Sequence, residues 1–221
     1  MISVIIPAYN EEKRIGKTLT KILREKVGEV IVVFDGKDNT PKIVKKFEKV
    51  KLLQFNRRLG KGKAIKRGFN SSKGNIVVFA DADYGWQKTK IKKLTKWIGK
   101  YDIAIASRDR KSEKKISRKI ASYGFNFLVK IILGLRLNDT QCGFKAFKRD
   151  VLADLFKRTK TNGYAFDAEM LYLAKNRYSI KEVPVKWNFE KNSKISILRD
   201  GIKMFVELLK IRWIHWKKKK N

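Results

Sequence analysis

Two carboxylates, Asp81 and Asp83, stand one residue apart at the end of the apolar run Ile76 to Ala80. The run is short and partly β-branched, and Ser-Ser-Lys-Gly comes shortly before it, which predicts a strand buried on both faces. In an open α/β sheet, ligands bind beyond the carboxyl ends of the strands, so we expect both carboxylates at that edge. Their oxygens suit a hard divalent cation, and Mg²⁺ is usually held by one or two carboxylates together with substrate phosphates. Asp81 and Asp83 are therefore candidate ligands of Mg²⁺ or Mn²⁺, with a plain acidic turn as the alternative.

A basic loop, residues 56–63, opens the helix that precedes this strand and contains Gly60 and Gly62. Its spacing is not that of a P-loop, but its backbone N–H groups and Lys61 or Lys63 could bind a phosphate. A flexible basic turn is the alternative. No Gly-x-Gly-x-x-Gly follows the first strand, which disfavours a dinucleotide-binding domain.

Strands and helices are expected to alternate through the first half of the chain. The runs that predict strands span residues 2–6, 29–34, 50–55, 75–80 and 102–107. Asn10 is a candidate N-cap for the first helix, with Glu11 and Glu12 in its first turn. A later helix is expected over residues 87–98. The alternation predicts an α/β fold with a central, mostly parallel sheet flanked by helices.

The alternation breaks after residue 108. Residues 116–135 are rich in apolar side chains, and residues 138–147 indicate a loop that enters a strand. A helix over residues 166–176 and a strand over residues 180–185 follow. Pro184 favours a place for this last strand at the edge of the sheet.

The final helix, expected over residues 196–216, combines a broad apolar face with a narrow polar stripe. It contains Trp213 and Trp216, and four lysines follow, which is typical of a helix lying in a membrane interface. Polybasic segments gain about 1 kcal/mol per charge near anionic lipid. A helix packed on the sheet with a solvated tail is the alternative, and residues 125–135 offer a second apolar surface of the same kind. His215 is expected at the interface or the surface.

Length and composition limit the class of protein. The 221 residues suffice for one compact domain, and 54 basic against 21 acidic residues give a net charge of +33. Such a charge indicates an anionic partner, namely nucleic acid, an anionic membrane surface or phosphate-bearing substrates, unless the excess is simply solvated. The single cysteine, Cys142, excludes an internal disulfide and a four-ligand zinc site, and we expect a packed thiol. No stretch reaches the ~18 apolar residues of a membrane span, so a peripheral protein on the cytoplasmic face of the membrane is expected.

Several short motifs occur together along nearly the whole chain. They are Pro7-Ala-Tyr-Asn-Glu11, Gly60-Lys-Gly-Lys-Ala64, Asp81-Ala-Asp83, Ser107-Arg108, Asp139-Thr-Gln-Cys-Gly-Phe-Lys-Ala-Phe147, Phe166-Asp-Ala-Glu169 and Glu182-Val-Pro-Val-Lys-Trp187. In this order and spacing they resemble the inverting family 2 glycosyltransferases of GT-A fold. The later motifs are similar to those of the branch that glycosylates polyprenyl phosphates, such as dolichyl phosphate.

The resemblance implies a nucleotide-sugar site across the carboxyl ends of the first four strands. The residues expected to bind the donor are Pro7, Ala8, Tyr9, Glu11, Asp35, Lys61, Lys63, Asp81 and Ala82. Asp81 would contact the ribose or the metal shell. Asp83 would bind the metal, which bridges the diphosphate and stabilises the charge that grows on the leaving group.

The acceptor decides whether a catalytic base is needed. A phosphate monoester has a second pKa of about 6 and is already an anion at pH 7, whereas a sugar hydroxyl must lose a proton. Arg108, Arg118 and Lys145 are the candidate cations for an acceptor phosphate. Asp139 and Glu169 could orient sugar hydroxyls or these cations, or act as the base, while an acidic first helical turn is the alternative for Glu169. The expected catalytic residues are thus Asp83, Arg108, Asp139 and Glu169.

The resemblance implies a metal-dependent inverting transfer of a hexose from a UDP- or GDP-sugar to a polyprenyl phosphate, with glucose favoured over mannose. One alternative keeps the fold but transfers sugar to a saccharide or protein hydroxyl. The other is a basic nucleic-acid-binding module, which the dispersed basic residues disfavour. We expect one GT-A domain over residues 1–221. Its parts are a nucleotide-sugar half (1–110), an acceptor half (111–195) and an amphipathic basic helix and tail (196–221).

Overall fold

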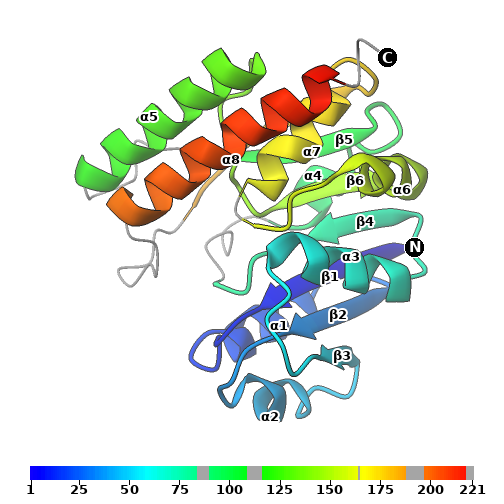
Figure 1. Cartoon of the computed structure of the whole chain (residues 1–221). Coiled ribbons are helices and arrows are strands. Elements are labelled where there is room, and N and C mark those ends of the chain that lie inside the picture. Colours follow the sequence, from blue (N-terminus) through cyan, green and yellow to red (C-terminus); the bar gives the residue numbers. More distant parts are fainter. Residues whose placement is uncertain (84–89, 109–115, 164, 188–196, 218–221) are drawn as a thin grey trace.

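The computed structural model describes residues 1–83, 90–108, 116–163, 165–187 and 197–217. The strands are β1 (Ile2–Ala8), β2 (Glu29–Phe34), β3 (Val50–Gln54), β4 (Ile76–Phe79), β5 (Ile103–Arg108), β6 (Lys145–Lys148) and β7 (Ile180–Val185). The helices are α1 (Ile15–Ile22), α2 (Thr40–Val44), α3 (Lys61–Ser71), α4 (Lys92–Thr95), α5 (Ile116–Leu133), α6 (Arg149–Arg158), α7 (Phe166–Ala174) and α8 (Ile197–Lys217). Within the described residues the strands form one sheet in the order β3-β2-β1-β4-β6-β5-β7 (Figure 1).

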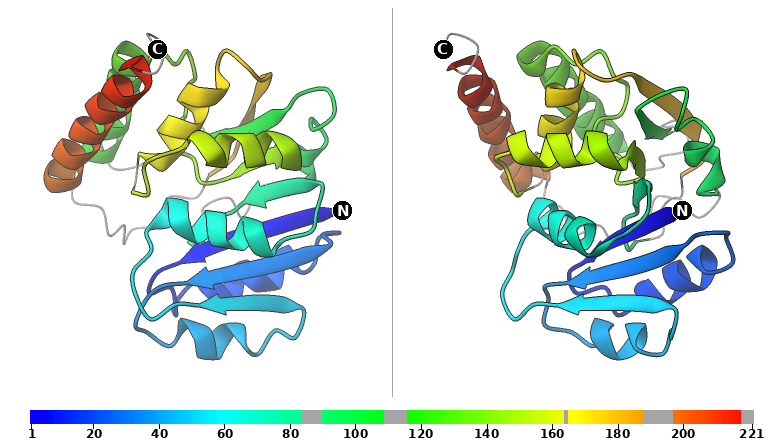
Figure 2. Two further views of the ribbon diagram at one scale, coloured as in Figure 1. Left: turned by 45° about the vertical axis from the view of Figure 1, so that its right-hand side comes forward. Right: turned by 90° about the vertical axis from the view of Figure 1, so that its right-hand side faces the viewer.

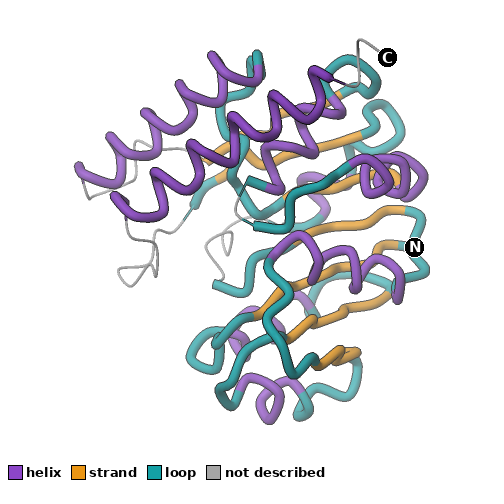
Figure 3. The backbone as a smooth tube through the Cα atoms, viewed as in Figure 1, coloured by secondary structure: helices purple, strands orange, loops and turns teal. Residues whose placement is uncertain are grey.

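The sheet is mostly parallel and has helices on both faces, which confirms the predicted fold class (Figures 2 and 3). Successive residues of a strand point to opposite faces, so each central strand supplies two cores. In β1, for example, Ile5 belongs to the core that includes side chains of α3, α6 and α7, whereas Val4 and Ile6 belong to the core that includes side chains of α1, α2 and α4. Because both faces of β1 are covered, it is apolar along its length, as the sequence predicts.

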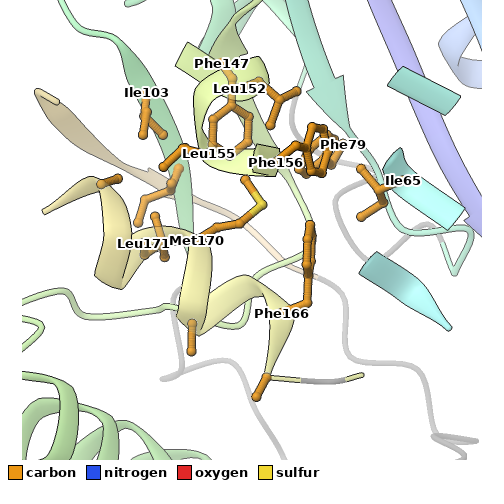
Figure 4. Close-up of a cluster of buried hydrophobic side chains, with 14 of the residues drawn as sticks. Ile65, Phe79, Ile103, Phe147, Leu152, Leu155, Phe156, Phe166, Met170 and Leu171 are labelled. Carbon is orange, nitrogen blue, oxygen red and sulfur yellow. The ribbon is translucent and has the colours of Figure 1, made fainter. Parts of the chain in front are cut away.

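The core on the α7 side joins the two halves of the chain. The rings of Phe79 of β4 and Phe147 of β6 are tilted against each other with centroids 4.9 Å apart, and Phe166 of α7 stacks on Phe156 of α6 at 6.2 Å. Figure 4 shows these rings with Ile65 of α3 in the same cluster. α7 is therefore packed firmly against the sheet, which matters for the carboxylates that it carries.

β6 is the exception to the parallel order. It lies between β4 and β5 and is antiparallel to both, with Lys145 opposite Phe79. Because β6 runs against β4, the loop that enters β6 lies at the carboxyl end of β4. This brings residues 139–144 next to Asp81.

Four details differ from the sequence-based expectations or complete them. The prediction that Asn10 caps the first helix is wrong, since α1 begins only at Ile15, Asn10 has a positive φ of 56°, and its side-chain oxygen accepts a hydrogen bond from the Lys37 N–H. Helix α6 was not predicted. The edge position of Pro184 is confirmed, because β7 ends the sheet. Of the expected helix over residues 87–98, only α4 falls within the described residues, and residues 84–89 lie outside them.

α5 and α8 lie side by side beyond α7, as all views show (Figures 1 and 2). Their inner faces are buried, at Val129 and Leu133 of α5 and at Leu208 and Ile211 of α8. Their outer faces expose large apolar side chains, at Phe127, Ile131, Phe205, Val206, Leu209, Trp213 and Trp216. We call these seven residues the α5–α8 surface. In the part of the chain that the structure describes, no helix is both long enough and apolar enough to cross a bilayer.

Candidate functional site

Asp81 follows β4 at the carboxyl edge of the sheet and meets a lysine of the basic loop. Helix α3 begins at Lys61, whose Nζ lies 3.3 Å from Asp81 Oδ1. Both side chains keep some exposure, 30% for Asp81 and 21% for Lys61. The end of β4 and the basic loop therefore meet through an ion pair between these two side chains.

Lys61 also contacts the second half of the chain, at α7. Its Nζ lies 2.8 Å from Oδ2 of Asp167, the second residue of α7, and Asp167 Oδ1 lies 2.6 Å from Lys145 Nζ. The Lys145 ammonium also donates to the backbone oxygen of Cys142. Asp81, Lys61, Asp167 and Lys145 thus form a chain of alternating charges that links β4, α3, α7 and β6. We call it the charge chain.

Burial and charge act in opposite directions on these groups. Burial alone would lower the pKa of the Lys61 ammonium, but the carboxylates of Asp167 and Asp81 outweigh it and raise that pKa above its ordinary value. Burial would likewise raise the pKa of the Asp167 carboxyl, but the charges of Lys145 and Lys61 hold it below the usual range. Both groups therefore carry their charges at neutral pH.

Two further residues fix the position of Lys61 and Asp81. Asp35 Oδ2 accepts hydrogen bonds from the N–H groups of Leu59 (2.8 Å) and Gly60 (3.1 Å), so this carboxylate holds the basic loop. Gly60 has a φ of +81°, which favours glycine there. On the other side, a Cβ at Gly143 would overlap the Asp81 carboxylate, so glycine at this position lets the carboxylate lie where it does.

Arg108 ends β5 at the same edge of the sheet. Its Nε and Nη2 lie 2.6 and 2.9 Å from the two oxygens of Asp139, a paired contact that orients the guanidinium plane. Asp139 is 1% exposed, and the Arg108 guanidinium also lies over the Trp187 ring at 5.5 Å. Burial would lower the pKa of Arg108, but the negative charges of Asp139 and, more weakly, Asp81 raise it. Arg108 is therefore a fixed cation whose field reaches Asp81.

The residues expected around the nucleoside follow β1. Pro7 and Ala8 end that strand, and Tyr9 is 36% exposed beneath the Arg58 guanidinium, which lies 3.7 Å from its ring centroid. Glu11 forms an ion pair with Arg14 at 2.6 Å. An exposed aromatic ring beside a cation suits a base or ribose, so this arrangement is compatible with the predicted role.

Glu169 lies apart from the charge chain. Asp167 and Glu169 are two residues apart on α7, so their side chains do not share a face of the helix. Glu169 is fully buried, accepts hydrogen bonds from the Lys160 N–H and from the N–H and hydroxyl of Thr161, and lies 2.7 Å from His215 Nε2. The prediction that His215 is at the membrane interface or the surface is wrong. His215 is only 8% exposed, and from α8 it packs against Glu169 and Tyr172 of α7.

The remaining predicted residues have simpler positions. Lys63 is exposed on α3, and the side chain of Arg118 lies outside the described part of the structure. Lys145 is 1% exposed and committed to Asp167, so in this conformation it supports the site from inside the protein. Cys142 is a packed thiol as predicted, and burial raises its pKa to about 12.

The carboxylates after β4 fit a metal that the substrate helps to bind. Asp81 and Asp83 are both partly exposed, and Ala82 between them is buried, with its carbonyl accepting a 2.8 Å hydrogen bond from the Thr18 hydroxyl. Among the described residues no group of three or more His, Cys, Asp or Glu side chains could enclose an ion. Two carboxylates at an open edge suit Mg²⁺ or Mn²⁺ completed by diphosphate oxygens, and they do not suit a metal enclosed by protein alone.

Sequence reasoning missed the roles of Asp167, Gly143 and His215. Asp167 and Gly143 lie within motifs that the sequence analysis singles out, so the motifs themselves were the available signal. The acidic start of a helix is so common that Asp167 alone indicated nothing more. The pairing of His215 with a residue 46 positions away had no local signal.

Comparisons with known proteins identify the family of this chain. Residues 3–156 match the family model described as "Glycosyl transferase family 2". The dolichyl-phosphate β-glucosyltransferases of Saccharomyces cerevisiae and Homo sapiens are 36% and 34% identical, with 96% of this chain and 74% of each relative covered. Glycosyltransferase AglD of Haloferax volcanii is 32% identical over 96% of this chain and 37% of its own length.

Solved structures share the fold. Glucosyl-3-phosphoglycerate synthase from Mycobacterium tuberculosis in complex with phosphoglyceric acid has a TM-score of 0.76 at 21% identity, covering 96% of this chain and 79% of that one. Its complex with Mn²⁺, UDP-glucose and phosphoglyceric acid has a TM-score of 0.75 at 20% identity, covering 96% and 79%. The fold is therefore GT-A-like. The chain belongs to glycosyl transferase family 2 and is a glycosyltransferase that resembles the dolichyl-phosphate β-glucosyltransferases.

Proposed function

We propose that this protein transfers glucose, with inversion, from UDP-glucose to a polyprenyl phosphate such as dolichyl phosphate. The names of the yeast and human relatives support the sugar and the acceptor. Complexes of the fold neighbour with UDP and Mn²⁺ or Mg²⁺ support the nucleotide and the metal. GDP and mannose are the competing choices for the donor.

The observation that carries the proposal is the state of the two carboxylates named above as candidate bases, both of which lie in the described part of the structure. Asp139 is buried and bound through both oxygens to Arg108, and Glu169 is buried against Thr161 and His215. A hydroxyl acceptor needs a carboxylate that can take its proton. A phosphate acceptor needs cations and positioning, which Arg108 supplies. The engagement of both carboxylates therefore favours the phosphate acceptor over the hydroxyl alternative.

The residues of this chain would divide the reaction between them. Tyr9 and the end of β1 bind the nucleoside, and Asp81 and Asp83 hold the metal that, when bound, neutralises the diphosphate as it leaves. Arg108, oriented by Asp139, holds the acceptor phosphate so that its oxygen attacks the anomeric carbon from the face opposite the diphosphate. The bond from that carbon to the diphosphate oxygen breaks as the new bond to phosphate forms, and the configuration inverts.

We further propose that the protein binds peripherally to an anionic membrane surface on the cytoplasmic face. A polyprenyl phosphate is anchored in a bilayer, and the α5–α8 surface exposes two tryptophans on the same helix as exposed Lys203 and Lys210. Aromatic side chains beside lysines are what an interfacial helix needs.

Transfer of label from UDP-[¹⁴C]glucose and, in parallel, GDP-[¹⁴C]mannose to a short polyprenyl phosphate with Mg²⁺ or Mn²⁺ tests the reaction. We expect label in the organic phase from UDP-glucose. Label that appears only on an added saccharide or protein would establish the hydroxyl-acceptor alternative instead.

The variant Asp83→Ala tests the metal assignment in the same assay. We expect kcat/KM to fall on the order of 10²-fold, because the charge on the leaving diphosphate loses its stabilisation. Asp150→Ala removes an exposed carboxylate from the first turn of α6 and is the matched control, expected to retain activity. Full activity in Asp83→Ala would contradict the assignment. A nucleic-acid-binding module would bind nucleic acid equally well with or without Asp83.

A further inference from the structure

The charge chain places a lysine between two carboxylates that belong to different halves of the protein. Lys61 lies closer to Asp167 (2.8 Å) than to Asp81 (3.3 Å). Asp167 is 3% exposed and packed into the core, whereas Asp81 is 30% exposed at the donor edge. The buried carboxylate is therefore the more firmly placed of the two partners.

A divalent cation at Asp81 would compete with the Lys61 ammonium for the same carboxylate. If Asp81 were the sole counter-ion of Lys61, engaging a metal would leave that ammonium without a full partner in a largely dehydrated place. Asp167 removes this conflict, because it neutralises Lys61 from the side away from solvent. Lys145 in turn forms an ion pair with the other carboxylate oxygen of Asp167, Oδ1.

We propose that Asp167 is a positioning residue of the donor site, which retains Lys61 so that Asp81 can serve the metal-bound nucleotide. The inference rests on the proposed function and assigns Asp167 a role that acts through Lys61. It also explains why Lys145 is buried: Lys145 keeps Asp167 charged and in place. In this arrangement the acceptor half of the chain, through α7 and β6, sets the charge at the donor edge.

The experiment measures how much a divalent cation tightens nucleotide binding. Isothermal titration gives the Kd of UDP, and separately of GDP, with Mn²⁺ and with EDTA, and the ratio of the two Kd values is the metal coupling. We expect Asp167→Asn to reduce this coupling about tenfold, or about 1.4 kcal/mol, because Lys61 then draws on Asp81 alone. Asp154→Asn on α6, whose carboxylate pairs with Arg158 at 3.0 Å, is the matched control and should keep the wild-type coupling.

A second variant separates positioning from simple charge balance. Asp167→Asn leaves Lys145 buried without its partner, so a lower Tm is expected. Asp167→Asn combined with Lys145→Met restores charge neutrality, and we expect Tm to recover while the metal coupling stays low. Recovery of the coupling together with Tm would overturn the proposal, since Asp167 would then only neutralise Lys145.

The remaining outcomes are also decisive. Wild-type coupling in Asp167→Asn would overturn this inference and leave the proposed function intact. Failure of the wild-type protein to bind either nucleotide would instead overturn the proposed function, and this inference with it. If Asp167→Asn alone does not fold, the metal coupling of the double variant is compared with that of the wild-type protein instead.

Discussion

At Gly143 the lack of a side chain decides where the Asp81 carboxylate can lie at the carboxyl edge of the sheet. The loop that enters β6 runs against Asp81 so closely that a Cβ at this position would overlap the carboxylate. The end of an aspartate side chain can swing away at little cost, unlike backbone. A methyl group here would therefore move the Asp81 carboxylate with little effect on the fold.

We expect Gly143→Ala to weaken metal-dependent binding of UDP about tenfold while Tm changes little, because the added methyl group displaces the Asp81 carboxylate from its position at the sheet edge. Titration calorimetry with Mn²⁺ and thermal unfolding measure the two effects. Gly124→Ala on α5 is the control, since no atom lies within 4 Å of the added methyl group. Helix propensity predicts that this control raises stability by up to about 1 kcal/mol and leaves binding unchanged. If Gly143→Ala bound UDP with Mn²⁺ as tightly as the wild-type protein, the position of Asp81 would not determine metal-dependent nucleotide binding.

At the scale of elements, α7 connects two parts of the molecule through two carboxylates. Asp167 contacts α3 and β6, whereas Glu169 contacts the segment before α7 and His215 of α8. A third carboxylate, Glu207 of α8, accepts a 3.0 Å hydrogen bond from the N–H of Ala165, the N-cap residue of α7, so α8 is bound to α7 and its N-cap at two places. The segment before α7 also reaches α3, where the Gly62 N–H donates to the Asn162 carbonyl. The α5–α8 surface is thereby joined to the basic loop.

Glu169→Gln tests how much this connection stabilises the protein. Both oxygens of Glu169 accept hydrogen bonds, and an amide would set an NH₂ group against two donors. We expect a loss of about 2–3 kcal/mol in the free energy of unfolding at pH 7, measured by urea denaturation. Glu48→Gln, at an exposed position, is the control and should cost less than about 0.5 kcal/mol.

The same variant should show a defined pH dependence. Burial would raise the pKa of Glu169, but hydrogen bonds from His215, Thr161 and Lys160 outweigh it, so the pKa in the folded state lies below that in the unfolded state. The stabilisation is then complete above the unfolded value of about 4.3 and is lost as the pH falls through the lower folded value. The difference in unfolding free energy between wild type and Glu169→Gln should therefore shrink below about pH 4. A difference that stayed constant with pH would contradict the charged, hydrogen-bonded state of Glu169.

At the scale of the whole molecule, the sequence predicted what depends on local pattern. Apolar runs such as Ile76 to Ala80 identify buried strands, and the order of elements in an α/β sheet puts Asp81 at its carboxyl edge. Contacts that depend on how distant elements pack could not be predicted. The antiparallel insertion of β6, which brings Gly143 to Asp81, and the burial of Lys145 and His215 against carboxylates of α7 are of this kind. A buried lysine and an exposed one look alike in sequence, because only a distant partner distinguishes them.

The net charge of +33 leaves open whether lipid binding would come from overall charge or from one face. The α5–α8 surface argues for one face, since Trp213 and Trp216 are 57% and 49% exposed on it. We expect Trp213→Ser combined with Trp216→Ser to lower partitioning onto vesicles containing phosphatidylserine at least about tenfold in a flotation assay, because buried aromatic area is lost at the interface.

Charge variants decide between a face and the overall field. Lys203→Ser with Lys210→Ser removes two exposed charges from α8. Each charge contributes about 1 kcal/mol to the free energy of membrane binding if it lies near anionic lipid. Lys45→Ser with Lys46→Ser removes the same charge just after α2, near the opposite end of the sheet, and serves as the matched control (Figure 1). We expect the α8 pair to weaken binding roughly tenfold or more and the control pair to have a much smaller effect. Equal losses of vesicle binding in the two pairs would mean that the overall charge drives binding, because a field summed over the whole molecule does not distinguish the two ends. If the wild-type protein itself stayed in solution with anionic vesicles, the membrane proposal would be wrong.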